Sequence, residues 1–283
     1  MTYTTLVSTD LLASHLDQWA IVDCRFDLQR EEAGREEYRA GHIPGAVYAS
    51  LNDDLSATRT GTNGRHPLPS VEALAAAFGR LGIDRATQVV VYDQDSGLFA
   101  SRLWWSLKYL GHDAVALLDG GWAKWVREGR RTRHGDESRR PTEFVAAPRQ
   151  HLRVGIAEVS AHLNDPRALL VDARGPDRFE GRSETVDPVA GHIPGATNHF
   201  YKWNLADDGT MLPPDSLREN FARLLGGRAP GDAVMYCGSG VSACHNLLAM
   251  EHAGLEGTKL YPGSWSEWSS DPARPIETGP PKR

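Results

Sequence analysis

The sequence predicts an α/β protein that contains two copies of one domain, each with a mostly parallel β-sheet and helices on both faces. Two observations support this prediction. A long internal repeat runs through the 283 residues, and strand-like and helix-like segments alternate within each half. Length alone leaves open one large domain or two domains of about 140 residues. The repeat favours two domains.

Four landmarks recur in the same order along the chain. The run Ala-Gly-His-Ile-Pro-Gly-Ala occurs twice, and its two copies are identical in all seven positions. The offsets between copies lie between 143 and 150 residues, which is too long for a solenoid and indicates a duplicated domain. The landmark pairs are 21–25 with 170–174, 40–46 with 190–196, 89–92 with 233–236, and 121–125 with 264–268.

The repeat predicts an N-terminal domain over residues 1–130, a linker over 131–150 and a C-terminal catalytic domain over 151–283. The segment from Arg130 to Pro141 is polar and basic, with almost no apolar side chains, so we expect a surface linker. A basic patch that binds nucleic acid is the alternative. Acidic residues interrupt the segment and no aromatic residue interleaves, which argues against that alternative.

In the first half, short runs rich in β-branched residues predict buried strands at 19–23 and 88–92. Apolar residues at helical spacing predict a helix from Val71 to Leu81, with Ser70 as its N-cap and Gly82 as its stop. A second helix is predicted from Leu98 to Tyr109, and a strand follows at 114–118.

The second half repeats this order. We expect a helix that follows Val154-Gly155-Ile156 and runs to about Leu163, strands at 168–172 and 233–236, and helices at 215–225 and 243–252. Strands that alternate with helices predict a parallel sheet covered on both faces. In such sheets the functional residues lie beyond the carboxyl ends of the strands.

Composition and charge exclude several function classes. The formal net charge of −6 argues against a protein that binds nucleic acid or an anionic membrane by bulk attraction. No apolar run approaches the roughly 18–20 residues of a membrane span, and the first residues do not resemble a signal peptide. Three cysteines without a Cys-x-x-Cys pair fit neither a disulfide scaffold nor a zinc site. We therefore expect a cytoplasmic protein with no metal and no cofactor.

Cys237 stands directly after the predicted strand at 233–236. The residues that follow, Gly238, Ser239, Gly240, Val241 and Ser242, lead into a predicted helix. Two glycines in this turn allow successive backbone N–H groups to point inward, and a helix N-terminus binds anions. Such surroundings favour the reactive thiolate, so we predict that Cys237 is a nucleophile.

A buried structural cysteine is the alternative interpretation of Cys237. For Cys24 and Cys244 we expect packing roles and leave a redox role open. At the position that corresponds to Cys237, the first half carries Asp93, with Asp95 two residues later. Two carboxylates would repel a bound anion, so we predict that the first half is catalytically silent.

The two tandem halves, the Gly-His-Ile-Pro-Gly run in each, the cysteine loop in the second half and the segment 261–268 resemble the two-domain rhodanese sulfurtransferases. The loop resembles the 3-mercaptopyruvate sulfurtransferase form, whereas the thiosulfate-specific form has Arg-Lys where this chain has Gly238-Ser239. The resemblance implies rhodanese folds and a persulfide on Cys237. It also implies 3-mercaptopyruvate or thiosulfate as sulfur donor, and cyanide or a thiol such as thioredoxin as acceptor.

The resemblance also implies roles for particular residues. Backbone N–H groups from Gly238 to Ser242 would stabilise the thiolate and the persulfide, and Ser239 would relay a proton. Arg178 matches the arginine that binds the donor carboxylate. His66 matches a histidine that approaches the cysteine from across the domain interface, although a plain surface-loop histidine is an equal alternative.

One departure from the family pattern bears on the donor. A second arginine stands nine residues after the first in animal-type enzymes, but this chain has Asp187 there, or Thr185 if the count runs back from His192. Arg182 is the candidate replacement. The departure keeps thiosulfate open as a donor. His42 and His192 occupy matching positions in the two halves. We interpret them as turn residues rather than metal ligands.

Two rival functions remain to be weighed. A cysteine-based phosphatase needs an arginine six residues after its cysteine, and this chain has Ala243 at that position, which argues against phosphatase and arsenate reductase chemistry. A sulfur carrier or scaffold without turnover is the non-enzymatic alternative. Formation of pyruvate from mercaptopyruvate would distinguish an enzyme from a carrier.

Overall fold

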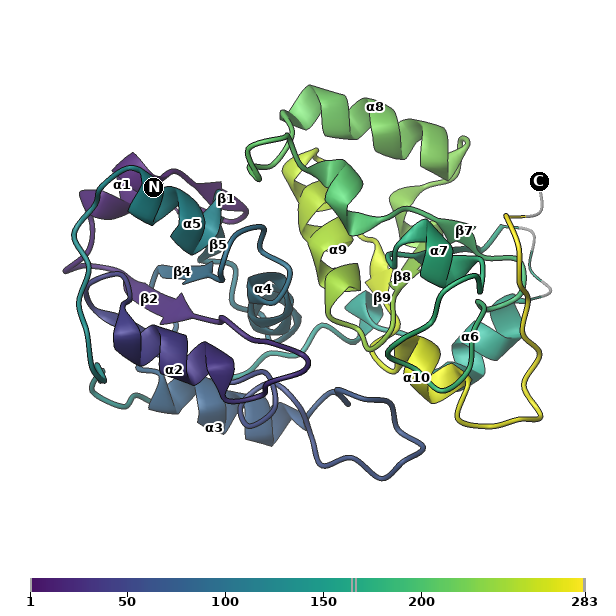
Figure 1. Cartoon of the computed structure of the whole chain (residues 1–283), viewed down its shortest axis with the longest axis horizontal. Coiled ribbons are helices and arrows are strands. Elements are labelled where there is room, and N and C mark those ends of the chain that lie inside the picture. Colours follow the sequence, from purple (N-terminus) through teal and green to yellow (C-terminus); the bar gives the residue numbers. More distant parts are fainter. Residues whose placement is uncertain (1, 164, 166, 282–283) are drawn as a thin grey trace. The chain divides into compact units, whose positions relative to one another are not determined.

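The computed structural model describes residues 2–163, 165 and 167–281, which form two compact units, each with its own sheet (Figure 1). Unit 1 comprises Met1–Ala57, Pro69–Arg149 and Asp207–Met211, and unit 2 comprises Thr58–Leu68, Gln150–Ala206 and Leu212–Arg283. Residues 58–68 therefore group with unit 2, although they belong to the first half of the sequence. The predicted domain limits at 130 and 151 stay a prediction, and the outer limits at 1 and 283 lie outside the described residues.

Unit 1 contains a five-stranded parallel sheet with the strand order β1-β5-β4-β2-β3. Its elements are β1 (Leu6–Val7), α1 (Thr9–Ala13), β2 (Ala20–Asp23), α2 (Ala33–Ala40), β3 (Ala46–Tyr48), α3 (Val71–Arg80), β4 (Val89–Tyr92), α4 (Ala100–Tyr109), β5 (Val115–Leu118) and α5 (Gly121–Arg127).

Unit 2 contains a four-stranded parallel sheet with the order β7-β6-β8-β9, which repeats the order of β3, β2, β4 and β5. Its elements are η1 (Gln150–Leu152), α6 (Ile156–His162), β6 (Leu169–Asp172), α7 (Pro176–Phe179), β7 (Thr197–Asn198), η2 (Tyr201–Asn204), α8 (Pro214–Leu225), η3 (Pro230–Asp232), β8 (Ala233–Tyr236), α9 (Ser242–His252), β9 (Lys259–Leu260) and α10 (Ser264–Trp268).

Helices cover both faces of each sheet. In unit 1 one face packs against Leu12 of α1 and Trp125 of α5, and α4 packs along β4 and β5. In unit 2 one face packs against Val159 of α6 and Trp265 of α10, while α9 lies on β8 and is itself covered by α8 (Figure 1). Every residue of the central strands β4 and β8 is buried, as in parallel sheets that helices cover on both sides. The predicted α/β fold class is confirmed.

A buried arginine connects the repeated motifs within each unit. In unit 2, Arg174 forms an ion pair with Asp172 at the end of β6 (2.6 Å), donates to the carbonyl oxygen of Gly191 (2.7 Å) and lies 5.0 Å from the centre of the Trp265 ring. The arginine thus joins β6, the Gly-His-Ile-Pro-Gly turn and α10. In unit 1, Arg25 makes the same three contacts with Asp23 (2.7 Å), Gly41 (2.6 Å) and Trp122 (4.7 Å).

The histidines of the two Gly-His-Ile-Pro-Gly turns are buried and bonded within their own units. Nδ1 of His42 bonds to the carbonyl oxygen of Tyr38 at 2.8 Å, and Nδ1 of His192 bonds to that of Phe179 at 2.8 Å. Each ring also stacks on the ring of the same partner. These contacts agree with a role in the turn. Among the described residues, no three acidic, histidine or cysteine side chains gather as metal ligands would.

The loop after β4 in unit 1 is filled by its own carboxylate. Asp93 is fully buried, and its side chain accepts backbone N–H groups from Gly97 (2.9 Å), Phe99 (2.7 Å) and Ala100 (3.1 Å). Burial raises the pKa of Asp93 to about 6 against the opposing effect of these hydrogen bonds. The loop therefore already holds an anion, which is the side chain of Asp93 itself.

Across the described part of the chain, none of the helices combines the length and the apolar run that crossing a bilayer requires.

The raised pKa of Asp93 predicts a pH-dependent contribution to stability. Between the ordinary pKa of 3.8 and the folded value of about 6, the folded state binds the proton more tightly than the unfolded state does. This contribution is present at about pH 4 and lost as the pH rises through about 6, by about 3 kcal/mol. Urea unfolding should show the free energy of unfolding of the wild type falling over this range relative to Asp93→Asn. A difference that does not vary with pH would contradict the prediction.

Candidate active site

Cys237 is the first residue after β8, and its buried sulfur lies within the loop that leads to α9. The backbone N–H of Gly240 donates to Sγ at 3.1 Å. Gly240 has a φ of +74°, a left-handed conformation that favours glycine and sets the path of this loop. The N-terminus of the eleven-residue helix α9 follows directly, and its positive end favours an anion. The loop is therefore suited to stabilise a thiolate.

The N-terminal turn of α10 holds the other side of this loop. Backbone N–H groups of Trp265 and Ser266 donate to the carbonyl oxygens of Cys237 and Gly238, both at 2.9 Å. In unit 1 the first turn of α5 holds the loop after β4 in the same way, with donors Trp122 and Ala123 and acceptors Asp93 and Gln94, again at 2.9 Å. The two units thus share one arrangement, and only the residues of the loop differ.

Ser264 supplies a contact that its counterpart in unit 1 cannot. Among the described residues, Ser264 is the only non-glycine residue with a positive φ (55°), and the matching residue in the repeat is Gly121 (53°). Its Oγ accepts the backbone N–H of Cys237 (3.1 Å) and donates to the carbonyl oxygen of Tyr261 (2.9 Å). A strained serine at this point therefore anchors the backbone of Cys237.

Ser239 and His66 lie within hydrogen-bond distance of each other. His66 belongs to residues 58–68 of unit 2, and its Nδ1 shares a hydrogen bond of 2.8 Å with Oγ of Ser239. Both side chains are buried. A hydroxyl two residues after Cys237 is thereby connected to an imidazole.

Two guanidinium groups approach the loop at Gly238. A Cβ atom on Gly238 would lie 2.9 Å from Nη2 of Arg65 and 3.5 Å from Nη2 of Arg178. Arg178 was predicted from the sequence, whereas Arg65 was not singled out, although it stands next to His66. Asp187 lies between them and forms ion pairs with both, the one to Nη2 of Arg178 at 2.9 Å. Long side chains at 238 would displace this pair of arginines.

Arg182 lies outside this group of residues. Its guanidinium pairs with Asp177 (2.7 Å) and Glu180 (2.8 Å), and its side chain is 61% exposed. Val241 and Ser242 belong to the loop and to the first position of α9. The structure therefore brings together the loop residues 237–242 with His66 and Arg178, and leaves Arg182 apart.

The other two cysteines are buried free thiols. Sγ of Cys244 donates to the carbonyl oxygen of Gly240 at 3.2 Å, so it supports the loop from the side of α9. Burial, followed by the nearby carboxylates of Asp23 and Asp93, raises the pKa of the Cys24 thiol well above its ordinary value. Cys24 therefore remains protonated and a poor nucleophile.

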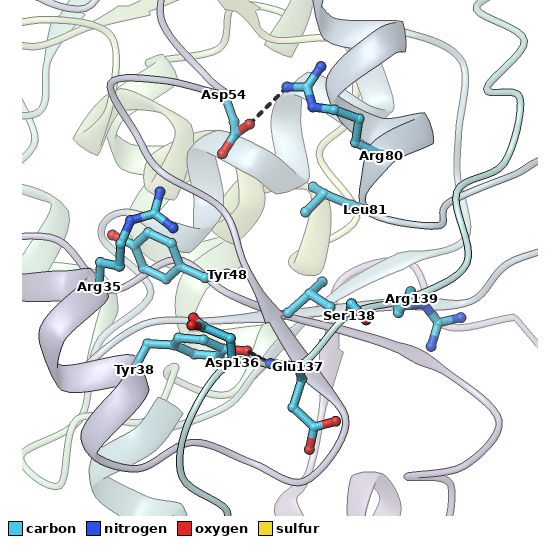
Figure 2. A pocket seen from close by; sticks show the side chains of 11 residues that line it. Arg35, Tyr38, Tyr48, Asp54, Arg80, Leu81, Asp136, Glu137, Ser138 and Arg139 are labelled. Atoms are coloured by element: carbon cyan, nitrogen blue, oxygen red, sulfur yellow. Dashed lines mark hydrogen bonds and ion pairs between the residues drawn. The ribbon is translucent and has the colours of Figure 1, made fainter.

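Unit 1 contains a cavity of about 300 Å³ between α2, α3, β3 and residues 136–139. Figure 2 shows Arg80 paired with Asp54 (3.0 Å) and the hydroxyl of Tyr38 bonded to the backbone N–H of Glu137 (2.8 Å). These groups pair with one another, and no cysteine is among the described residues that line the cavity.

Comparison with known proteins gives the family. The rhodanese-like domain family matches residues 8–128 and 156–271. The probable 3-mercaptopyruvate sulfurtransferase of Pseudomonas aeruginosa is 46% identical over 278 residues, which is 97% of this chain and 98% of that protein. SseB of Mycobacterium tuberculosis, provisionally named a thiosulfate sulfurtransferase, is 41% identical over 93% of this chain and 92% of its own length. The crystal structure of SseA, a 3-mercaptopyruvate sulfotransferase from Escherichia coli, has a TM-score of 0.81 and 33% identity and covers 93% of this chain and 99% of its own.

The chain belongs to the rhodanese family, as one of its tandem-domain sulfurtransferases. The family and the enzyme class expected from the sequence are thereby confirmed. The names of the relatives differ in the sulfur donor, so the donor is a matter for proposal.

The variant Ser264→Gly introduces the residue that the first repeat has at the matching position, Gly121. It tests whether the hydroxyl of Ser264 positions Cys237, apart from the backbone strain at residue 264. Ser264→Gly relieves a left-handed serine but removes the acceptor for the N–H of Cys237, two effects of about 1 kcal/mol and opposite sign. We expect the free energy of unfolding in urea to change by less than about 1 kcal/mol, while kcat falls about tenfold. An unchanged kcat would show that the hydroxyl does not position Cys237.

Proposed function

We propose that this chain transfers sulfur from 3-mercaptopyruvate to an acceptor through a persulfide on Cys237. The observation that carries the proposal is the convergence on one loop of a buried thiol, a Ser239–His66 hydrogen bond and the guanidinium of Arg178. A thiol, a proton relay and a cation that binds a carboxylate are what this donor requires.

In the first half-reaction the thiolate of Cys237 attacks the sulfur of 3-mercaptopyruvate. A sulfur–sulfur bond forms, the carbon–sulfur bond of the donor breaks, and pyruvate enolate leaves with the electron pair. The enolate takes a proton, for which the hydroxyl of Ser239 is the relay and His66 the reservoir. The N–H of Gly240, which bonds to Sγ at 3.1 Å, stabilises the negative sulfur before the attack.

In the second half-reaction an acceptor removes the outer sulfur and restores the thiolate. A small thiol, a protein thiol such as that of thioredoxin, or cyanide can attack the persulfide, and each yields a sulfur-bearing product. A reducing compartment such as the cytoplasm suits this cycle because Cys237 must return to the thiol form. All three cysteines of the chain are free thiols.

The donor preference rests on what surrounds Gly238. 3-Mercaptopyruvate carries one carboxylate and a ketone, and Gly238 and Ser239 offer hydrogen bonds without added charge. Thiosulfate is a dianion, which additional cations in the loop would hold more tightly. Thiosulfate on the same site is the second candidate, supported by the name of the Mycobacterium tuberculosis relative. A carrier without turnover is the third.

Turnover with two donors tests the proposed reaction. With cyanide as common acceptor, we expect kcat/KM for 3-mercaptopyruvate to exceed that for thiosulfate by about tenfold or more. We expect Cys237→Ser to form no pyruvate, because the oxygen nucleophile cannot form the persulfide. Pyruvate formation by the wild type at the level of Cys237→Ser would leave only the carrier function, and a thiosulfate preference would refute the donor assignment.

Two arginines compete for the role of binding the carboxylate. Arg178→Gln should raise KM for 3-mercaptopyruvate about tenfold with little change in kcat, because an ionic hydrogen bond to the donor is lost. The variant should fold, since Glu184 keeps Arg174 and Asp187 keeps Arg65 as partners. Arg182→Gln, which removes an exposed guanidinium paired with Asp177, should leave KM unchanged. Steady-state kinetics that show the reverse order would assign the carboxylate to Arg182.

A further inference from the structure

The arginines beside the cysteine loop belong to one connected group of ion pairs. The links are Arg174–Asp172 (2.6 Å), Arg174–Glu184 (3.3 Å), Arg178–Glu184 (2.9 Å), Arg178–Asp187 (2.9 Å) and Arg65–Asp187. The group contains three guanidiniums and three carboxylates, so its formal charges cancel. The donor site is therefore lined by cations whose charge the protein has already balanced.

Asp187 is the carboxylate of this group that lies nearest the loop. Its side chain is only 2% exposed, its Oδ2 would lie 3.4 Å from a Cβ on Gly238, and its two oxygens each hold one guanidinium. Burial raises the pKa of Asp187, although Arg65 and Arg178 pull it down. Burial of a carboxylate at an anion-binding site is costly, and it reduces the attraction that the two arginines exert on a donor.

Arg65 is held so that it faces the same point. Its backbone N–H donates to Oγ of Ser266 at 2.9 Å, next to the turn that holds the cysteine loop. Its Nη2 would lie 2.9 Å from a Cβ on Gly238, closer than Arg178. Within the described residues, its buried Nε has no hydrogen-bond partner. The fold itself thus leaves one N–H donor of Arg65 unsatisfied.

We propose that Arg65 is the second cation of the donor site and that Asp187 determines specificity by limiting the positive charge of the two arginines. The site then favours a donor with one negative charge over a donor with two. This inference rests on the proposed function, since it concerns the donor of the same reaction. Attraction to the site is proportional to the charge of the ligand, whereas the cost of removing an ion from water grows with the square of that charge. A balanced site therefore disfavours the dianion.

Asp187→Asn tests the role of the carboxylate, and Asp177→Asn is its matched control. Both substitutions remove one negative charge, but Asp177 pairs with the exposed Arg182. In Asp187→Asn we expect kcat/KM for thiosulfate to rise about tenfold and that for 3-mercaptopyruvate about threefold, because the gain scales with ligand charge. In Asp177→Asn the ratio of the two values should stay that of the wild type. An unchanged ratio in Asp187→Asn, or an equal change in Asp177→Asn, would overturn the proposal.

A binding measurement separates this inference from the reaction itself. The rate at which iodoacetamide alkylates Cys237, followed by mass spectrometry of its peptide, reports protection by pyruvate as the monoanion and by sulfate as the dianion. Asp187→Asn should strengthen protection by sulfate more than protection by pyruvate. Arg65→Gln, a change in a loop, should weaken protection by pyruvate about threefold and protection by sulfate about tenfold, because the loss also scales with ligand charge.

The turnover measurement and the protection measurement test different statements. A wild type without turnover would refute the proposed function, while the protection constants would still decide the charge rule. If Asp187→Asn does not fold, Arg65→Gln decides, and unchanged protection by both anions in that variant would overturn the inference.

Discussion

The buried pair between Arg174 and Asp172 is the interaction on which the catalytic unit depends. It removes two charges from water, which is favourable only because further partners satisfy the guanidinium. Those partners are the carbonyl oxygen of Gly191, the carboxylate of Glu184 and the face of Trp265. Burial by itself lowers the pKa of Arg174. The nearby acidic groups, Asp172 above all, raise it more, so the pKa of Arg174 lies above its ordinary value.

Each contact of Arg174 positions a part of the site. Through Trp265 it fixes the first turn of α10, whose N–H groups bind the carbonyl oxygens at 237 and 238. Through Glu184 it orders the segment that carries Asp187, since Glu184 accepts the backbone N–H of Asp187 at 3.0 Å. Loss of the arginine would leave Asp172 buried without its main partner, so both the fold and the cysteine loop would be affected. The Asp-x-Arg and Gly-His-Ile-Pro-Gly motifs are repeated because they build this frame.

Comparison of the two units separates the frame from the chemistry. In each unit a loop follows a central strand, which is β4 in unit 1 and β8 in unit 2. The backbone N–H groups of that loop point toward an acidic side chain. In unit 1 it is the carboxylate of Asp93, and in unit 2 it is Cys237, which is suited to be a thiolate. Both units thus provide backbone N–H donors at this loop, to the carboxylate of Asp93 in unit 1 and to Sγ of Cys237 in unit 2.

Much of the fold follows from local patterns. Ser70 caps α3 and Gly82, with a φ of +72°, follows its end, as the sequence predicted. The helix predicted from Leu98 begins at Ala100, because the backbone N–H groups of Phe99 and Ala100 bind Asp93. The strands β3, β7 and β9, of two or three residues, were not predicted, because they are too short to show a period and exist through their neighbours in the sheet.

The residues of the candidate site also differ in whether the local sequence indicates them. Cys237 could be recognised because strand, glycine-rich turn and helix are adjacent in the sequence. Arg65 could not, because its role depends on Asp187, a residue 122 positions away. Asp187 itself was interpreted only as a missing cation. In the structure its carboxylate is what holds a different cation at the loop, a relation between distant residues that one sequence does not reveal.

Residues 58–68 belong to the second unit, so that unit is not built from the second half of the sequence alone. The repeat divides the chain near residue 150, but the fold assigns His66 and Arg65, which are encoded in the first copy, to the catalytic unit. A gene that lost its first copy would encode the sheet of unit 2 and Cys237, but not His66, which bonds to Ser239, nor Arg65, which lies beside Gly238. The two halves of the sequence are therefore not interchangeable, because the second unit includes residues that belong to the first half.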